Sequence, residues 1–161
     1  MKRLLIAVGA LAVLVAAGAS AQQGVREERP TAVSATLLGP AFFGSVNVER
    51  YFTNWLGVSA GIGGFPSIAD VDGFLAVPVL LQAQLGRDEH SLYLAGGLEW
   101  LVSRASLAPR GVKSSWLAVA QIGYQWQGRG GIFLRPALAL LVPLDGKSVA
   151  PTAGLTIGYA F

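Results

Sequence analysis

Apolar residues occupy every second position over most of the chain beyond residue 31. Between residues 55 and 65, for example, Leu56, Val58, Ala60 and Ile62 alternate with glycines and one serine. A period of two predicts β-strands, and clusters of Gly, Pro, Asn and Asp between the runs predict turns. The runs with this pattern are 42–52, 55–65, 74–85, 91–103, 115–127, 132–142 and 152–161.

The connections between these runs alternate in length. The long connections are 66–73, 104–114 and 144–151, and the short ones are 53–54, 86–90 and 127–131. Bacterial outer-membrane barrels combine long extracellular loops with short periplasmic turns, and their strands are about 9–11 residues long. The alternation therefore predicts a transmembrane barrel of the Gram-negative type, with Phe161 on the periplasmic side.

Closure of such a barrel requires an even number of strands. Segment 31–38, followed by a turn at Gly39 and Pro40, is therefore predicted to be the first of eight strands. The alternative is that this segment continues into the run 42–52 as one kinked strand, which leaves the seam of the barrel unexplained. The predicted fold class is all-β, an eight-stranded antiparallel up-and-down transmembrane β-barrel over residues 31–161.

The polar residues of the runs keep to one face. In the run 42–52, Ser45, Asn47 and Glu49 share a face that opposes Val46 and Val48. In the other runs, the face opposite to the apolar one also carries polar residues, namely Gln82, Gln84, Glu99, Gln121 and Gln125. We use the word parity for the face to which a residue is assigned by its place in this alternation. A soluble β-sandwich or a lipocalin-like barrel also alternates, but its water-facing side carries long charged side chains. Here the second face consists largely of Gly, Ala, Ser and Gln, which suits the interior of a narrow barrel whose apolar face meets lipid.

Aromatic residues on the apolar parity gather at the ends of the runs, as expected for side chains at the two membrane interfaces. The inferred periplasmic ends carry Phe52, Tyr124, Trp126, Tyr159 and Phe161, and the opposite ends carry Trp100 and Trp116. Arg50 has the apolar parity near a periplasmic end, where its long side chain can reach the interface.

The N-terminal residues 1–21 have the form of a cleaved signal peptide. Lys2 and Arg3 precede an apolar run that ends in an Ala-Ser-Ala site, and the run is too short for a spanning helix. Residues 22–30 are predicted to be a flexible lead-in. Cleavage leaves ten basic and nine acidic residues, a net charge of +1, so the basic pI is not a sign of nucleic-acid binding. The absence of cysteine excludes both a lipoprotein and a disulfide framework.

Charged residues on the interior parity are the most informative chemical feature. Glu49, Glu99 and Arg135 all have this parity, and unpaired charges inside a narrow barrel are costly. Glu49 and Arg135 lie at similar distances from the periplasmic ends of their runs, and Glu99 lies further out. We therefore expect an ion pair between Glu49 and Arg135 that plugs the lumen; the functional alternative is a gated ion path.

His90 is the only histidine, and it stands beside Ser91 in a segment that also contains two carboxylates. A hydrolase site is the functional interpretation, but neighbours in sequence rarely form a catalytic triad. The segment is also predicted to be periplasmic, away from the outer leaflet. We interpret it as a solvated turn.

Three other segments suggest ligands only weakly. Gly61, Gly63 and Gly64 lack the lysine and the helix of a nucleotide loop and are expected to fill lumen positions. Asp70 and Asp72 are two carboxylates of a loop without further cation ligands. A basic loop cluster suits lipopolysaccharide phosphates or solvent equally well. That cluster consists of Arg104, Arg110 and Lys113.

The end of the chain resembles the carboxyl-terminal signal by which the assembly machinery recognises outer-membrane barrels, with Leu155, Ile157, Tyr159 and Phe161 in alternation. Short segments elsewhere are similar to a family of small outer-membrane β-barrel proteins. These segments are 37–39, 45–50, 61–63, 123–125 and 135–136, together with Pro78. The resemblance spans nearly all of the chain beyond the signal peptide and brings no catalytic residue with it.

The sequence therefore predicts a small integral outer-membrane protein with a structural or interaction role. We expect no enzymatic activity, no cofactor and no metal. The expected partners are outer-membrane lipid, including lipopolysaccharide, and the barrel assembly machinery. The alternatives are a lipid-modifying barrel enzyme and a narrow transporter of small apolar molecules.

Overall fold

A computed structural model describes residues 28–41, 43–65, 73–87, 89–104, 112–146 and 149–161. The described residues form eight strands. These are β1 (Thr31–Leu38), β2 (Gly44–Tyr51), β3 (Leu56–Phe65), β4 (Phe74–Arg87), β5 (His90–Arg104), β6 (Val112–Gln127), β7 (Ile132–Pro143) and β8 (Ala150–Ala160). The predicted signal peptide, residues 1–21, lies outside the described part. No helix within the described residues is both long and apolar enough to span a membrane.

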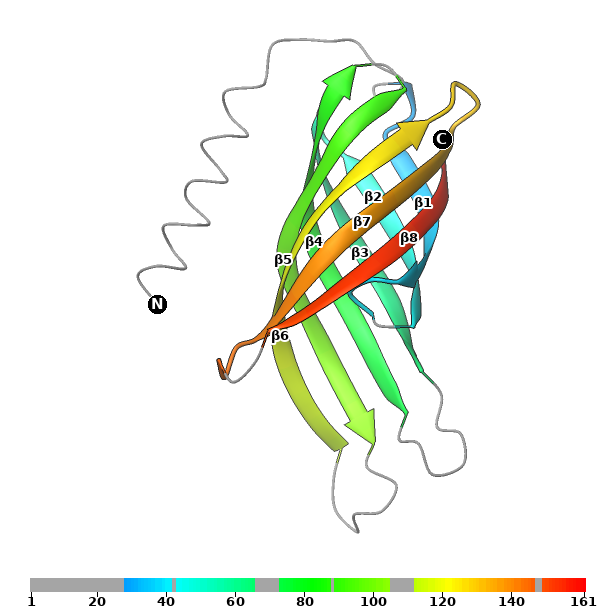
Figure 1. The fold of residues 1–161 in the computed structure, drawn as a ribbon. Coiled ribbons are helices and arrows are strands. Elements are labelled where there is room, and N and C mark those ends of the chain that lie inside the picture. The colour runs from blue at the N-terminus through cyan, green and yellow to red at the C-terminus, as the bar shows by residue number, and fades with distance from the viewer. Residues whose placement is uncertain (1–27, 42, 66–72, 88, 105–111, 147–148) are drawn as a thin grey trace.

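The eight strands close into one antiparallel barrel in which each strand pairs with its neighbours in the sequence. The seam forms between β1 and β8, where Ala32 pairs with Ala160 and Leu38 with Gly154. Figure 1 shows the strands tilted around a common axis. The predicted fold class is thus confirmed, and segment 31–38 is a separate first strand.

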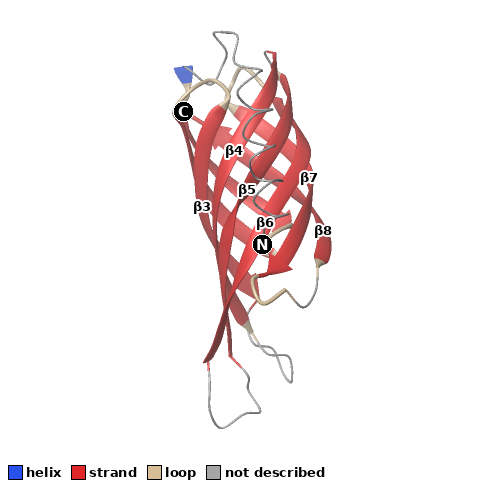
Figure 2. Ribbon diagram, turned by 90° about the vertical axis from the view of Figure 1, so that its left-hand side faces the viewer, coloured by secondary structure: helices blue, strands red, loops and turns tan. Residues whose placement is uncertain are grey.

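We call the two ends of the barrel the short-turn end and the long-loop end. The short-turn end carries residue 161 and the connections β2–β3, β4–β5 and β6–β7, and the long-loop end carries the others. Strands β4, β5 and β6 have 14, 15 and 16 residues, against 8 in β1 and β2. The wall is therefore taller on the β4–β6 side, which extends beyond the rest at the long-loop end (Figures 1 and 2).

The longer strands correct several predicted boundaries. β4 and β5 continue to Arg87 and His90, so that the predicted turn 86–90 shortens to residues 88–89. β6 begins at Val112 rather than at residue 115. The ends of paired strands often continue beyond their apolar pattern, because backbone hydrogen bonding in the ladder does not depend on side-chain polarity.

The end of the predicted lead-in is held against the barrel. The guanidinium of Arg29 donates a hydrogen bond to the carbonyl oxygen of Gly130, at 2.8 Å, in the β6–β7 turn. The amide of Tyr51 donates to the carbonyl oxygen of Pro30, at 2.7 Å. Residues 29 and 30 therefore belong to the short-turn end of the barrel and not to a free tail.

The alternation of faces follows the sequence pattern. Large apolar side chains such as Val46, Ile62, Leu138 and Ile157 are exposed on the outside, while the opposite parity is buried. The interior divides into two halves. Toward the long-loop end it is mainly apolar, with Leu80, Val119 and Leu141 packed together. Toward the short-turn end it is mainly polar, apart from an apolar cluster of Ala32, Phe133 and Ala160.

Candidate functional site

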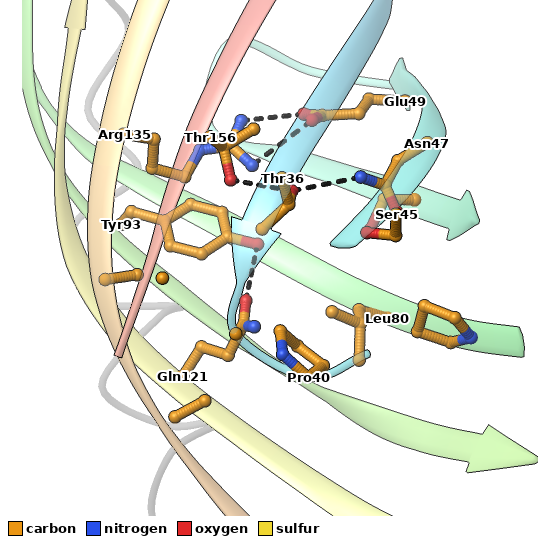
Figure 3. Close-up of a pocket in the computed structure, with 16 residues that line it drawn as sticks. Thr36, Pro40, Ser45, Asn47, Glu49, Leu80, Tyr93, Gln121, Arg135 and Thr156 are labelled. Carbon is orange, nitrogen blue, oxygen red and sulfur yellow. Dashed lines mark hydrogen bonds and ion pairs between the residues drawn. The ribbon is translucent and has the colours of Figure 1, made fainter. Parts of the chain in front are cut away.

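The polar half of the lumen is organised around Glu49 of β2 and Arg135 of β7. Nη1 and Nη2 of Arg135 donate to Oε1 and Oε2 of Glu49 at 3.2 and 2.7 Å, and the two side chains are only 5% and 1% exposed. Two parallel N–H···O bonds of this kind are the strong form of an Arg–carboxylate pair. The structure thus brings together the two lumen charges that the sequence places at a common depth (Figure 3).

The remaining hydrogen-bonding capacity of the Glu49 carboxylate is filled by neutral donors. Ser34 donates to Oε1 at 2.9 Å, and Tyr51 and Gln82 donate to Oε2 at 3.2 and 3.1 Å. These donors come from β1, β2 and β4. A buried charge pair is stable only when its other lone pairs are also satisfied, and here three strands, β1, β2 and β4, supply those donors in addition to Arg135 of β7.

Arg135 is held from three further sides. Its Nε donates to Oε1 of Gln125 at 2.7 Å. Its guanidinium carbon lies 4.1 Å from the ring centre of Tyr93 and 5.0 Å from that of Phe133. A cation over the face of an aromatic ring is attracted by the ring quadrupole. The guanidinium is therefore fixed across the lumen and does not hang free in it.

A chain of amide side chains continues the network toward the short-turn end. Gln84 donates to Gln125 at 2.9 Å and to the hydroxyl of Tyr51, and Gln125 donates to Gln127 at 3.1 Å. Ser91 donates to Gln84 at 3.4 Å. The sequence pattern assigned Gln82, Gln84 and Gln125 to the lumen, and the same parity could have identified Tyr51.

Glu99 does not join this network. Its side chain is 0% exposed, and neither carboxylate oxygen has a hydrogen-bond partner among the described residues. Its ladder neighbours are Pro78 and Leu117, which offer no side-chain donor. Glu99 therefore lies in the lumen, but it places a carboxyl group without a hydrogen-bond partner among the described residues in the apolar half.

A cavity of about 30 Å³ lies inside the barrel beside the ion pair. Its wall includes Thr36, Asn47 and Gln121, and Figure 3 shows these side chains around the same space as Tyr93. A volume of this size holds about one or two water molecules. Around this cavity, the described part of the lumen is occupied by buried side chains.

The β1–β2 turn adds to the closure in a way that the sequence pattern did not indicate. Pro40 lines the cavity, and Ala41 is fully buried. The amide of Gly39 donates to the carbonyl oxygen of Ala153 at 3.2 Å. The predicted turn at Gly39 and Pro40 thus folds into the lumen instead of standing out at the rim.

The structure separates His90 from Ser91. His90 is the first residue of β5, is exposed, and contacts the hydroxyl of Tyr124 on the outer face. Ser91 is buried in the lumen. The two side chains point to opposite faces of the barrel wall, so they do not form a catalytic pair. His90 is part of a strand, which corrects its assignment to a turn.

The three glycines also separate. Gly61 and Gly63 lie on the interior face: a Cβ atom on Gly61 would displace the side-chain amide of Asn47, and one on Gly63 would clash with the carbonyl oxygen of Gly44. Gly64 has the opposite parity and lines the outer face, which corrects the prediction that all three fill lumen positions. Asp70, Asp72 and Arg110, and the side chains of Arg104 and Lys113, lie outside the described part of the structure.

The aromatic residues predicted for the interfaces are exposed on the outer face near the strand ends. Trp100 and Trp116 face each other across β5 and β6, with ring centres 6.4 Å apart. The other exposed members are Phe52, Tyr124, Trp126, Tyr159 and Phe161. Amphipathic rings of this kind favour the level of the lipid headgroups.

Solved structures of two proteins share this architecture. The N-terminal β-barrel domain of Pseudomonas aeruginosa OprF matches with a TM-score of 0.67 and 13% identity, over 81% of this chain and 95% of that chain. Ail, the attachment invasion locus protein of Yersinia pestis, matches with a TM-score of 0.51 and 14% identity, over 81% of this chain and 93% of that chain. A second structure of Ail, in a phospholipid bilayer nanodisc, gives 0.53 and 14%, over 83% and 99%.

No protein-family model matches the sequence, and no curated protein matches it either. At 13–14% identity the likeness to OprF and Ail concerns the fold alone. The chain therefore has the fold of an eight-stranded antiparallel outer-membrane β-barrel.

Proposed function

We propose that this protein is exported by a cleaved signal peptide and resides in the outer membrane as a closed barrel with a structural or interaction role. The observation that carries the proposal is the combination of an apolar outer face with a lumen filled by a bonded polar network. Twenty-eight large hydrophobic side chains among the described residues are exposed, far more than a water-soluble surface of this size tolerates as one belt. Hydrocarbon is the environment that suits them.

The closed lumen favours this role over transport. Glu49, Arg135 and the glutamines around them cross the interior, and the space beside them holds no more than one or two water molecules. His90 lies at the short-turn end and Ser91 faces the lumen away from it, whereas an enzyme acting on outer-leaflet lipid needs its chemistry at the long-loop end. Lipid and lipopolysaccharide are the proposed surroundings, and Leu155, Ile157, Tyr159 and Phe161 are the proposed signal for the assembly machinery.

Two measurements separate this proposal from its alternatives. The refolded wild-type protein is expected to show no steady conductance in a planar lipid bilayer, and deletion of the gene is expected to leave the mass of lipid A unchanged. A stable open conductance would make the protein a channel, and a lipid A mass shift on deletion would make it an enzyme. Either result would overturn the proposed role.

A further inference from the structure

The β1–β2 turn covers the cavity beside the ion pair. Gly39, Pro40 and Ala41, which we call the inward turn, are all buried, although connections between strands usually lie on the surface. Pro40 lines the cavity, and Figure 3 shows it across the cavity from Glu49 and Arg135. Because the turn follows the long-loop end of β1, it lies between the cavity and the long-loop end of the lumen.

The inward turn is seated on glycines of the strands beside it. A Cβ atom on Gly154 of β8 would lie 2.8 Å from the Cα atom of Gly39. On the other side, a Cβ atom on Gly63 of β3 would lie 2.8 Å from the Cβ atom of Ala41. Contacts this short leave no room for a side chain at either position while the turn points inward. The two glycines therefore form a seat for the turn in the barrel wall.

The backbone where the inward turn begins is strained. Leu38 is the one non-glycine residue with a positive φ among the described residues, at 61°, and Gly39 follows it with 79°. The left-handed conformation is costly for any residue other than glycine. Burial does not compensate Leu38, because its side chain is 54% exposed. Strain of this kind persists only where the surroundings impose it, and it is typical of clamps and switches.

The inward turn also places apolar groups over polar ones. Pro40 and Ala41 have no polar side-chain atom, and the amide of Gly39 donates to the carbonyl oxygen of Ala153 at 3.2 Å. The uncharged polar side chains of the cavity wall are Thr36, Ser45, Asn47, Ser59, Gln121 and Thr156. Hydroxyl and amide groups gain hydrogen bonds from water when an apolar cover moves away. Hydration of the cavity wall and relief of the strain at Leu38 thus both favour an outward position of the turn, against the packing of its seat.

We infer that the inward turn is a lid, which opens by rotation of the backbone at Leu38 and admits water and small uncharged polar molecules to this cavity from the long-loop end. The open pocket still ends at the pair of Glu49 and Arg135, so opening of the lid produces a pocket and not a channel. This inference goes beyond the proposed function, because it gives the lumen a second conformation that can take up a small polar ligand.

Two substitutions are expected to shift the lid in opposite directions. Leu38→Gly removes the left-handed strain and favours the closed position. Gly154→Ala places a methyl group 2.8 Å from the Cα atom of Gly39 and displaces the lid from its seat. Gly96→Ala is the matched control, because the nearest atom to a Cβ on this glycine of β5 is the carbonyl oxygen of Val119, at 3.8 Å.

A single introduced cysteine reports the opening, since the sequence contains none. Ser45→Cys places the thiol in the wall of the cavity, at a position that is 8% exposed. Ser91→Cys places it at an equally buried position near the short-turn end, in the glutamine network and away from the lid. The folded proteins in lipid nanodiscs are treated with a small water-soluble thiol reagent, and mass spectrometry follows the rate of labelling.

We expect Gly154→Ala to raise the labelling rate at position 45 at least about tenfold, the factor that corresponds to the usual cost of overpacking. Leu38→Gly is expected to lower it about threefold to tenfold, because the strain that it removes is partly offset by the greater freedom of glycine in the open turn. Gly96→Ala is expected to leave this rate unchanged, and none of the three is expected to change the rate at position 91.

Three results would overturn the inference. Equal rates at position 45 in the unsubstituted background and in Leu38→Gly would show that the turn does not open at this residue, whether or not Gly154→Ala folds. Equal rates in Gly154→Ala and Gly96→Ala would show that the seat does not control access to the cavity. A parallel rise at positions 45 and 91 in Gly154→Ala would indicate loosening of the whole barrel instead of movement of a lid.

Discussion

Arg135→Ala is expected to lower the free energy of unfolding by about 3–5 kcal/mol, because it leaves the Glu49 carboxylate buried without its counter-charge. The Arg135 and Glu49 side chains are 5% and 1% exposed, so water does not replace the lost partner in the folded barrel. The three hydrogen bonds that Glu49 accepts from Ser34, Tyr51 and Gln82 remain, but none of these donors carries charge. Urea unfolding in lipid vesicles measures the change.

Two further variants serve as controls for this prediction. Glu99→Leu removes a buried carboxyl group that has no partner among the described residues, so it is expected to leave the stability unchanged or to raise it. The double variant Glu49→Gln with Arg135→Leu removes both charges and is expected to recover part of the loss seen in Arg135→Ala. Stability equal to that of the wild type in Arg135→Ala would show that the pair does not hold the lumen together.

Leu138→Arg is expected to cost about 2–4 kcal/mol, the range found for an arginine at the lipid-facing midplane of a barrel. Leu138 lies in the middle of β7, is 63% exposed, and pairs with Ile122 and Ala153 of the neighbouring strands. If the same surface faced water, exchange of an exposed leucine for arginine would change stability by only a few tenths of a kcal/mol. The same urea titration in vesicles reports the effect.

Leu144→Arg is the matched control for Leu138→Arg on the apolar outer face of the barrel. Leu144 is 59% exposed, almost the same fraction as Leu138, but it follows the end of β7 at the long-loop end. An arginine there reaches the headgroups and water, so the expected change is close to zero. Equal losses for both variants would mean that the cost depends on the side chain exchanged and not on depth in a membrane.

The fold was predictable because two simple rules of barrels act on the whole chain. A period of two assigns each side chain to one face, and closure requires an even number of strands. The second rule is what identified β1, whose eight residues would otherwise pass for part of a longer run. The pair between Glu49 and Arg135 followed from the same geometry, since equal parity and equal depth bring two side chains together across a narrow lumen.

Other features were not predictable because parity says nothing about radial position at a turn. The β1–β2 turn folds inward, with Pro40 against the cavity and Ala41 fully buried, although short loops usually lie on the surface. The outward position of Gly64, by contrast, was predictable, because it follows from the same alternation that places Ile62 on the outer face. The stacking of Tyr93 and Phe133 on Arg135 depends on the curvature of the barrel, which brings β5 and β7 near each other without a shared ladder.

The central claim is that the outer face of the barrel contacts hydrocarbon. Its most direct test is refolding of residues 22–161 from urea, once into buffer alone and once into lipid vesicles, followed by gel mobility with and without boiling. We expect a heat-sensitive, faster-migrating species and β-structure only in the presence of vesicles, with aggregation in buffer. A monomer that stays dissolved and folded in buffer alone would contradict the membrane assignment and every conclusion drawn from it.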